Sequence, residues 1–346
     1  MLAPPWIPVP PPAYGGIEEV VRLLCQGLTA NGHDVTLFAP PGSDSCAAVV
    51  PVLEEPHPDE IQKAQYEADH VARAFAEVDA AAERGEPFDV IHDHVGHTAL
   101  AMGDRVAAPL VHTLHGPFDE AACRFYAQHG RKARIVAISQ AQLDSAPPEM
   151  GGGDVVHNPI DCAEWPFREQ KDEFLLWIGR MSPDKGPQRA ITAAREAGAP
   201  LVLAGPVQPG QESFFAEEVE PQLGHDGIEY IGEADSERKR DLYQRARALL
   251  MPIRWPEPFG LVMVESLACG TPVIAFPEGS APEVVEHGRT GFVVDDEHAM
   301  ARAVERLGEI EPSDCRGACE HRFGVPAVVR GYEEVYRAAA ARRVPA

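Results

Sequence analysis

The sequence predicts an α/β protein built from two doubly wound parallel sheets, and three observations support this fold class. Short apolar runs alternate with amphipathic helical patterns along the 346 residues, as repeated β-α-β units require. The length suits two domains of ordinary size better than one. Residues 158–172 contain two prolines and no clean hydrophobic period, which indicates a linker between two series of strands.

The first series of strands precedes this linker. Short apolar runs predict strands at 35–39, 90–92, 110–113, 135–138 and 155–157. Apolar residues at helical spacing predict helices between them, among others at 18–29 and 60–83. Where a first strand is expected, only Met1, Leu2 and Ala3 precede a pair of prolines, so that strand is either very short or begins upstream.

The second series follows the linker and shows the same alternation. Strands are predicted at 174–178, 201–204, 229–231, 248–252, 273–276 and 292–294, with helices at 238–247, 261–269 and 297–308. A last helical pattern covers 325–343 and is expected to pack back toward the first domain. The predicted domains are therefore 1–158 and 159–324, followed by a C-terminal helical segment at 325–346.

The composition excludes several classes of partner. Acidic residues outnumber basic residues by 54 to 30, for a formal net charge of −24, which disfavours nucleic acid and stable docking on anionic lipid. No apolar run approaches the ~18 residues of a membrane span, and we see no secretory signal. The seven scattered cysteines disfavour a disulfide framework and favour the cytoplasm. Cys315 and Cys319 are either half of a metal site or, as we prefer, two thiols on one helix.

Ligands of open α/β sheets bind beyond the carboxyl ends of the strands, so we searched there for glycines and charged side chains. Gly15 and Gly16 open a predicted helix, whose free N–H groups attract an anion. The alternative is a plain loop followed by an acidic first turn.

Four histidines lie at two strand ends: His92, His94, His112 and His115. A metal site, a substrate contact and a structural role are all open, but metal ligands need a converging geometry that strand-end spacing does not guarantee. We favour a catalytic or substrate-binding role over a metal, with structural roles close behind for His92 and His112. His115, followed by Gly116, is the preferred candidate.

Arg180 and Lys185 share a loop that runs from a predicted strand into a helix. Arg recognises phosphate as a planar, bidentate donor and Lys supplies a mobile point charge, so both can reach a diphosphate. The alternative is that they pair with local carboxylates such as Asp184. We favour phosphate binding because the loop lies where this fold places ligands.

Glu257 and Glu265 flank a Pro-Phe-Gly turn that leads into a helix near Gly260. Glu265 lies ~7.5 Å along the helix axis from Gly260, at ~1.5 Å per residue. One carboxylate can thus face each end of a ligand over the helix N-terminus, and carboxylates accept hydrogen bonds from vicinal hydroxyls. A capping role is the alternative for Glu257, whereas Glu265 sits in an apolar helix where an unpaired carboxylate is costly.

With these motifs the chain resembles the retaining glycosyltransferases of family 4, which have the GT-B fold of two Rossmann-like domains facing a central cleft. The resemblance spans nearly the whole chain. It rests on Gly15-Gly16-Ile17-Glu18, Asn31-Gly-His-Asp-Val-Thr36, Phe88-Asp-Val-Ile-His-Asp-His94, Thr113-Leu-His-Gly116, Val136-Ala-Ile-Ser139, His157-Asn-Pro-Ile-Asp161, Gly179-Arg180, Lys185-Gly186, the Glu257-to-Glu265 block and Gly288-Arg-Thr-Gly-Phe-Val-Val-Asp295. The proline-rich opening and acidic balance resemble actinobacterial members that decorate antibiotic oligosaccharides such as avilamycin.

The resemblance implies donor-binding positions in both domains. The first domain would bind the acceptor and the second the nucleotide-sugar donor. Backbone groups of Gly15, Gly16 and Gly179 would lie against the donor, with the N–H of Gly16 at its diphosphate. Arg180 and Lys185 would neutralise that diphosphate as it leaves.

The resemblance also implies contacts to the nucleoside and to the transferred sugar. Glu265 would hold the ribose diol and Glu257 the sugar. The backbone around the sugar hydroxyls would come from Phe259, Gly260 and Leu261. His115 would contact a far hydroxyl of the sugar, and His94 the acceptor or the sugar. The implied catalytic residues are His115, Arg180, Lys185 and Glu257.

The implied reaction is a same-face displacement that retains the anomeric configuration. It needs no cofactor, and since no Asp-x-Asp motif follows a strand we expect no metal. The donor is expected to be UDP-linked, with GDP- and dTDP-linked sugars as alternatives, and the acceptor a hydroxyl of a small molecule or oligosaccharide of secondary metabolism. The alternative functions are an enzyme like the non-hydrolysing nucleotide-sugar 2-epimerases, a phosphorylase, and a non-catalytic nucleotide-sugar-binding protein.

Overall fold

The computed structural model describes residues 1–12, 15–61 and 63–341, and the chain forms two compact units. The first contains Met1–Pro159 and the segment from Val325 onward, and the second contains Ile160–Gly324. The first boundary lies one residue beyond the predicted position. The C-terminal helix, α13 (Val325–Ala341), belongs to the first unit, and the remaining predicted residues 342–343 lie outside the described part.

The first unit holds a parallel sheet. Its strands are β1 (Thr36–Ala39), β2 (Ala48–Pro51), β3 (Ile91–Asp93), β4 (Leu110–Thr113), β5 (Arg134–Ala137) and β6 (Asp154–Val155), paired as β1-β2 and β3-β4-β5-β6. Strand β2 was not predicted from the sequence. Its residues are partly exposed and end in a proline, so this strand lacks the continuous apolar run of a buried strand, and proline is tolerated in edge strands.

Leu2 fills the place of the missing first strand. It forms parallel bridges to Phe38 of β1 and Asp93 of β3, and thereby joins the two groups of strands. Its N–H donates to His92 O at 2.8 Å, and His94 N–H donates to Leu2 O at 3.0 Å. The order across the sheet is therefore β2-β1-Leu2-β3-β4-β5-β6. All strands are parallel, but their order in the chain runs outward in opposite directions from the boundary between Leu2 and β3.

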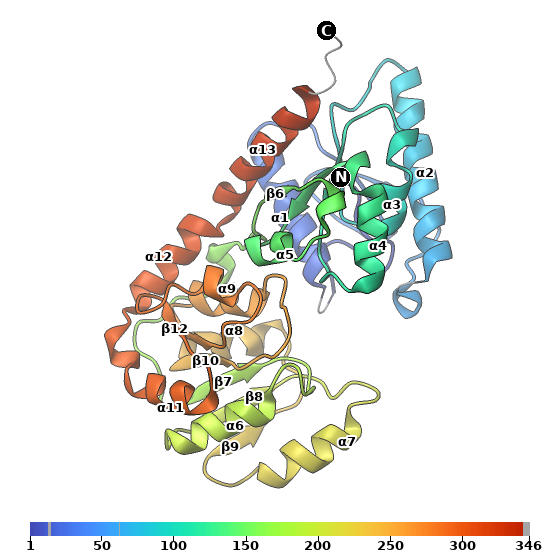
Figure 1. Ribbon diagram of the computed structural model, residues 1–346. Coiled ribbons are helices and arrows are strands. Elements are labelled where there is room, and N and C mark those ends of the chain that lie inside the picture. Colours follow the sequence, from blue (N-terminus) through green and yellow to red (C-terminus); the bar gives the residue numbers. More distant parts are fainter. Residues whose placement is uncertain (13–14, 62, 342–346) are drawn as a thin grey trace. The chain divides into compact units, whose positions relative to one another are not determined.

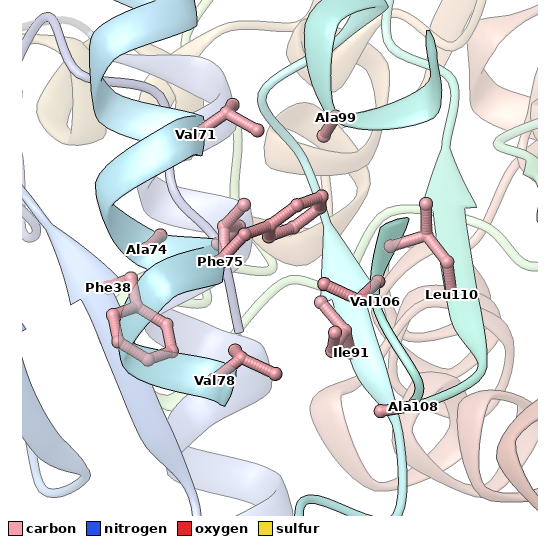
Figure 2. Packing of buried hydrophobic residues seen from close by; sticks show 11 residues of the cluster. Phe38, Val71, Ala74, Phe75, Val78, Ile91, Ala99, Val106, Ala108 and Leu110 are labelled. Carbon is pink, nitrogen blue, oxygen red and sulfur yellow. The ribbon is translucent and has the colours of Figure 1, made fainter. Parts of the chain in front are cut away.

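Helices cover this sheet. They are α1 (Gly16–Ala30), α2 (Ala64–Glu83), α3 (His97–Ala101), α4 (Glu120–His129), α5 (Gln140–Asp144) and α13. Figure 2 shows Phe75 of α2 reaching toward Ile91 of β3 and Val106, within one cluster of buried side chains. Burying large apolar side chains of this kind stabilises the fold by roughly 1.5–3 kcal/mol each.

Helix α13 packs on α1, although the two are about 300 residues apart in the chain (Figure 1). The close approach depends on Gly27 of α1, because a Cβ there would lie 2.5 Å from Val329 Cγ2 and 2.6 Å from Val325 Cγ1. Val328, Val329 and Tyr332 then share a buried cluster with α1 and β4.

The second unit holds a six-stranded parallel sheet in the order β12-β11-β10-β7-β8-β9. The strands are β7 (Leu175–Ile178), β8 (Leu201–Ala204), β9 (Ile228–Tyr230), β10 (Ala248–Met251), β11 (Val273–Ala275) and β12 (Gly291–Val293). The helices are α6 (Pro187–Glu196), α7 (Glu212–Phe214), α8 (Ser236–Arg245), α9 (Leu261–Ala268), α10 (Ala281–Val284), α11 (Glu297–Glu305) and α12 (Pro312–Arg322). This is the doubly wound order of a Rossmann fold, and it reverses between β7 and β10.

The cysteines are free thiols, and Cys315 and Cys319 are both buried on α12. In the part of the chain that the structure describes, no group of three or more histidine, cysteine or acidic side chains converges as metal ligands would. None of the helices within the described ranges is both long and apolar enough to cross a membrane.

Candidate active site

The reversal of strand order in the second unit defines one candidate site. β7 and β10 are parallel neighbours, so the loops that follow them leave the same edge of the sheet. The loop after β7 carries Gly179, Arg180 and Lys185, and the segment after β10 carries Glu257. The fold therefore brings together two groups that lie 72 residues apart in the sequence.

Two glycines allow these loops to pack at backbone contact. Gly186 has a φ of +75°, and a Cβ there would lie 2.4 Å from Pro252 O. Gly279 has a φ of +55°, and its Cβ would lie 2.3 Å from Glu257 O. Only glycine fits both the conformation and the space, so these positions hold Lys185 and Glu257 in place.

Lys185 and Glu257 form an ion pair. Lys185 Nζ lies 2.5 Å from Glu257 Oε2, and the side chains are only 18% and 13% exposed. The ammonium also lies 4.4 Å from the ring centroid of Trp255, a cation–π contact that orients it further. The partner of Lys185 is thus a carboxylate of the same predicted site and not the adjacent Asp184.

Arg180 is exposed and lies at the beginning of the loop that follows β7. Its Nη1 lies 3.4 Å from Gln208 Oε1, near the limit for a hydrogen bond. The five N–H donors of the guanidinium are therefore largely available to a ligand at this edge.

Helix α9 begins at Gly260 without a side-chain cap. Gly260 is left-handed with a φ of +74°, and the preceding Phe259 is buried, so Phe259 offers its backbone rather than its ring. By contrast, α8 and α11 in the same unit are capped by Asp235 and Asp296. The uncapped first turn, beginning at Leu261, presents N–H groups to an anion or hydroxyl.

Glu265 lies one turn into α9 and is held by two side chains from α8. Lys239 Nζ lies 2.7 Å from Oε1, and the Tyr243 hydroxyl donates to Oε2 at 3.0 Å. Glu265 was a candidate from the sequence, whereas neither of its two partners was predicted. The four-residue spacing of Lys239 and Tyr243, which places them on one helix face, was the signal that could have found them.

In the first unit, Gly15 and Gly16 follow the Leu2 strand and begin α1 without a side-chain cap. A Cβ at Gly15 would lie 2.6 Å from Pro11 Cβ, so the loop closes tightly here. Glu18 is buried in the same turn, and burial raises the pKa of its carboxyl. Tyr14, which precedes the two glycines, lies outside the described residues.

His94 and His115 are brought together in the first unit. His94 Nδ1 lies 2.9 Å from His115 Nε2, and the rings stack with centroids 5.2 Å apart. Burial lowers the pKa of His115 to about 3 and that of His94 well below its ordinary value. Both imidazoles are therefore neutral at pH 7. His94 Nε2 is buried and has no hydrogen-bond partner among the described residues.

His92 and His112 have structural environments. His92 lies between Thr113 Oγ1 and the Tyr336 hydroxyl, at 2.7 Å from each. His112 Nδ1 lies 2.5 Å from Asp93 Oδ2, and its Nε2 lies 3.1 Å from the Tyr126 hydroxyl. Both nitrogens of each ring are occupied, which leaves neither free for a metal or a substrate.

The predicted site residues thus form two sets, and each is described within its own unit. The histidines and the Gly15-Gly16 turn belong to the first unit, and the phosphate-binding and carboxylate candidates belong to the second.

Comparisons with known proteins identify the class. Residues 14–164 match the family model for Glycosyltransferase Family 4, and residues 163–317 match that for Glycosyl transferases group 1. Together with the two doubly wound sheets, these matches define a GT-B glycosyltransferase that uses a nucleotide sugar. The chain belongs to glycosyltransferase family 4, with a group 1 glycosyltransferase domain as its second half.

Individual relatives agree with this class. The glycosyltransferase AviGT4, involved in avilamycin A biosynthesis, is 29% identical over 97% of this chain and 93% of its own, with a TM-score of 0.72. Sucrose-phosphate synthase from Thermosynechococcus elongatus, at 20% identity, covers 99% of this chain and 98% of its own with a TM-score of 0.76, and shows the shared fold. A D-inositol 3-phosphate glycosyltransferase from Acidothermus cellulolyticus is 28% identical, covering 95% of this chain and 87% of that protein. A glycogen synthase from Mycobacterium tuberculosis is 27% identical, covering 82% and 79%.

Proposed function

We propose that the protein is a retaining, metal-independent glycosyltransferase that moves a sugar from a nucleotide diphosphate to a hydroxyl of a small molecule or oligosaccharide. The observation that carries the proposal lies at the strand reversal of the second unit. There Arg180, the Lys185–Glu257 pair and the uncapped start of α9 follow two neighbouring parallel strands.

The principal demand of the reaction is to stabilise charge on the departing diphosphate. The ammonium of Lys185 has three donors, so it can keep Glu257 and still bind a phosphate oxygen. Arg180 supplies a planar donor pair. The dipole of α9 adds about 0.3–1 kcal/mol, or ~2 in a partly buried geometry, so the two cations make the larger contribution.

The two glutamates are proposed to bind hydroxyls on either side of the diphosphate. Glu257 would contact the transferred sugar, with backbone N–H groups at Phe259, Gly260 and Leu261 around it. Glu265 would accept hydrogen bonds from the ribose diol. Both carboxylates are partly buried and anchored by lysines, so they are held in place before the ligand arrives.

The first unit is proposed to bind the acceptor and to offer contacts to the donor. His115 would contact a sugar hydroxyl as a neutral imidazole, with His94 beside it. The N–H of Gly16, at the uncapped start of α1, would approach the diphosphate, and the backbones of Gly15 and Gly179 would lie against the donor.

A retaining reaction proceeds either by two displacements through a carboxylate nucleophile or by one same-face displacement, and we propose the second. The first needs a carboxylate that is free to attack, whereas Glu257 Oε2 is paired with Lys185 Nζ at 2.5 Å, which lowers its nucleophilicity. A same-face displacement has no such need, because the leaving phosphate oxygen takes the proton from the acceptor hydroxyl. No metal enters this scheme, since the two cations supply the positive charge.

The setting in secondary metabolism is the remaining part of the proposal. It is supported by the 29% identity to AviGT4 along nearly the full length of both chains. The relatives named for glycogen and D-inositol 3-phosphate provide the competing acceptor classes, a glucan and a phosphorylated cyclitol.

The test begins with thermal shift of the purified protein against UDP-, GDP-, ADP- and dTDP-sugars. We expect stabilisation by one nucleotide class, with UDP first. The stabilising donor is then incubated with glucan, cyclitol phosphate and oligosaccharide acceptors, and the anomeric configuration of the product is read by proton NMR. An inverted anomer would refute retention. Donor binding without transfer or slow hydrolysis would instead identify a non-catalytic binding protein.

A further inference from the structure

We propose that Lys239 of α8 is a positioning residue of the donor site, which orients and neutralises Glu265 so that the enzyme prefers ribose over 2′-deoxyribose. This inference rests on the proposed function, because it takes Glu265 as the ribose contact. Lys239 belongs to none of the motifs by which the family was recognised.

The geometry fixes the carboxylate from two directions. Lys239 Nζ binds Oε1 at 2.7 Å, and the Tyr243 hydroxyl binds Oε2 at 3.0 Å. A carboxylate offers about four lone-pair positions, so one position on each oxygen remains. With both oxygens anchored, the remaining lone pairs point in set directions, as recognition of two vicinal hydroxyls requires.

The anchors are themselves held. Tyr243 is fully buried, and its ring meets Trp165 edge-on at 5.8 Å between centroids. Lys239 Nζ lies 5.7 Å from the Trp165 ring centroid. The ammonium is therefore close to both the carboxylate and the indole ring, and a cation gains from both neighbours.

Charge gives Lys239 a second effect. The side chain of Glu265 is 12% exposed and that of Lys239 is 18% exposed, and removing one partner of a partly buried pair leaves the other charge poorly compensated. The neutral hydroxyl of Tyr243 cannot compensate for this loss. The two lysines and two glutamates of the site sum to zero charge, which leaves Arg180 in excess for the diphosphate. Without Lys239 these residues would carry no net positive charge to attract that ligand.

The experiment measures binding by calorimetry at fixed salt, with UDP, GDP and ADP and the 2′-deoxy counterpart of each. We expect the wild type to bind one ribonucleotide at least ~10-fold more tightly than its deoxy form, as for the loss of a charge-assisted hydrogen bond. Lys239→Met should weaken binding of that ribonucleotide and bring the ratio of the deoxy to the ribo dissociation constant to within about threefold of unity. Lys239→Arg should retain most of the preference.

Arg238→Met is the matched control. It removes one positive charge from the exposed face of the same helix and should keep the wild-type ratio. A wild-type ratio in Lys239→Met, or a lost ratio in Arg238→Met, would overturn the assignment of Lys239.

A double-mutant cycle guards against misfolding of Lys239→Met. Glu265→Gln removes the carboxylate charge, and Lys239→Met with Glu265→Gln removes both charges together. If Lys239 acts through Glu265, the added lysine change costs little in the background of Glu265→Gln. An undiminished loss there would contradict the inference. Absence of wild-type binding to every nucleotide, by contrast, would refute the proposed function itself.

Discussion

The two units share a doubly wound strand order, which β6 extends by one strand in the first unit, but they differ in the chemistry of their strand reversals. In the second unit the reversal carries ion pairs, Lys185 with Glu257 and, nearby, Lys239 with Glu265. In the first unit it carries His94 and His115, whose pKa values are lowered by burial so that both are neutral. The same scaffold thus provides a charged edge and a neutral edge. The difference matches the two proposed ligands, a diphosphate in one case and sugar or acceptor hydroxyls in the other.

The N-termini of helices near the two strand reversals have backbone N–H groups that no side chain caps. Helices α1, α6 and α9 begin at glycines without side-chain caps, each close to a strand reversal. Helices α4, α5, α8 and α11 begin at Asp or Ser residues whose side chains accept a backbone N–H. A cap satisfies N–H groups internally, so its absence leaves them to a ligand.

The largest effect is expected from loss of the charged edge. Lys185→Ala and Arg180→Ala should each lower kcat by about 10²–10³-fold, because each removes charge stabilisation of the leaving group. Arg195→Ala changes an exposed arginine of α6 paired with Asp226, and should stay within about twofold of wild type. The measurement is initial-rate kinetics with the donor found by thermal shift. Near-wild-type turnover in both site variants would remove the phosphate role.

Glu265→Ala should reduce nucleotide affinity by roughly 10–150-fold, equivalent to the ~1.5–3 kcal/mol of a hydrogen bond to a charged group. Calorimetric titration measures the change, and the exposed Glu237→Ala on α8 is the control. Unchanged affinity in Glu265→Ala would refute its assignment to ribose.

The neutral edge predicts an acid-sensitive fold. The ordinary histidine pKa is 6.5, and burial lowers that of His115 to about 3, so between these values the unfolded chain binds a proton that the folded chain does not. The free energy of unfolding should therefore fall as pH drops from 6.5. His115→Gln should reduce this slope by up to about 1.4 kcal/mol per pH unit.

The control for this titration is the exposed His298, whose pKa is raised by its hydrogen bond to Glu196. Its contribution to the free energy of unfolding has the opposite pH dependence. That stabilisation is present below pH 6.5 and is lost as the pH rises through the pKa of His298 in the folded state. Urea denaturation at pH 7.0, 6.0 and 5.0 separates the two. An identical slope in wild type and His115→Gln would contradict the burial of a neutral imidazole.

The smallest effect is expected from metal removal. Because Arg180 and Lys185 carry the positive charge of the site, EDTA should leave turnover unchanged. Loss of activity that magnesium restores would show that the charged edge is incomplete without a cation.

The sequence predicted the parts of the fold that depend on local pattern. The strands expected at 110–113 and 201–204 coincide with β4 and β8, because buried parallel strands appear as short apolar runs. It also gave Arg180, Lys185, Glu257 and Glu265 as candidates, because glycine-rich turns and strand ends are where this fold places ligands. The part-exposed β2 and the single-residue contribution of Leu2 lack such a pattern.

The sequence by itself therefore determined the α/β class and the two series of strands, and it supplied the candidate residues that we propose bind phosphate and hydroxyls. Only the tertiary structure decided which of them meet: Lys185 with Glu257, His94 with His115, and Glu265 with a lysine and a tyrosine of another helix. Propensity and periodicity act over a few neighbouring residues. Ion pairs and side-chain hydrogen bonds are set by strand order and loop packing, because these bring together residues that lie far apart in the chain.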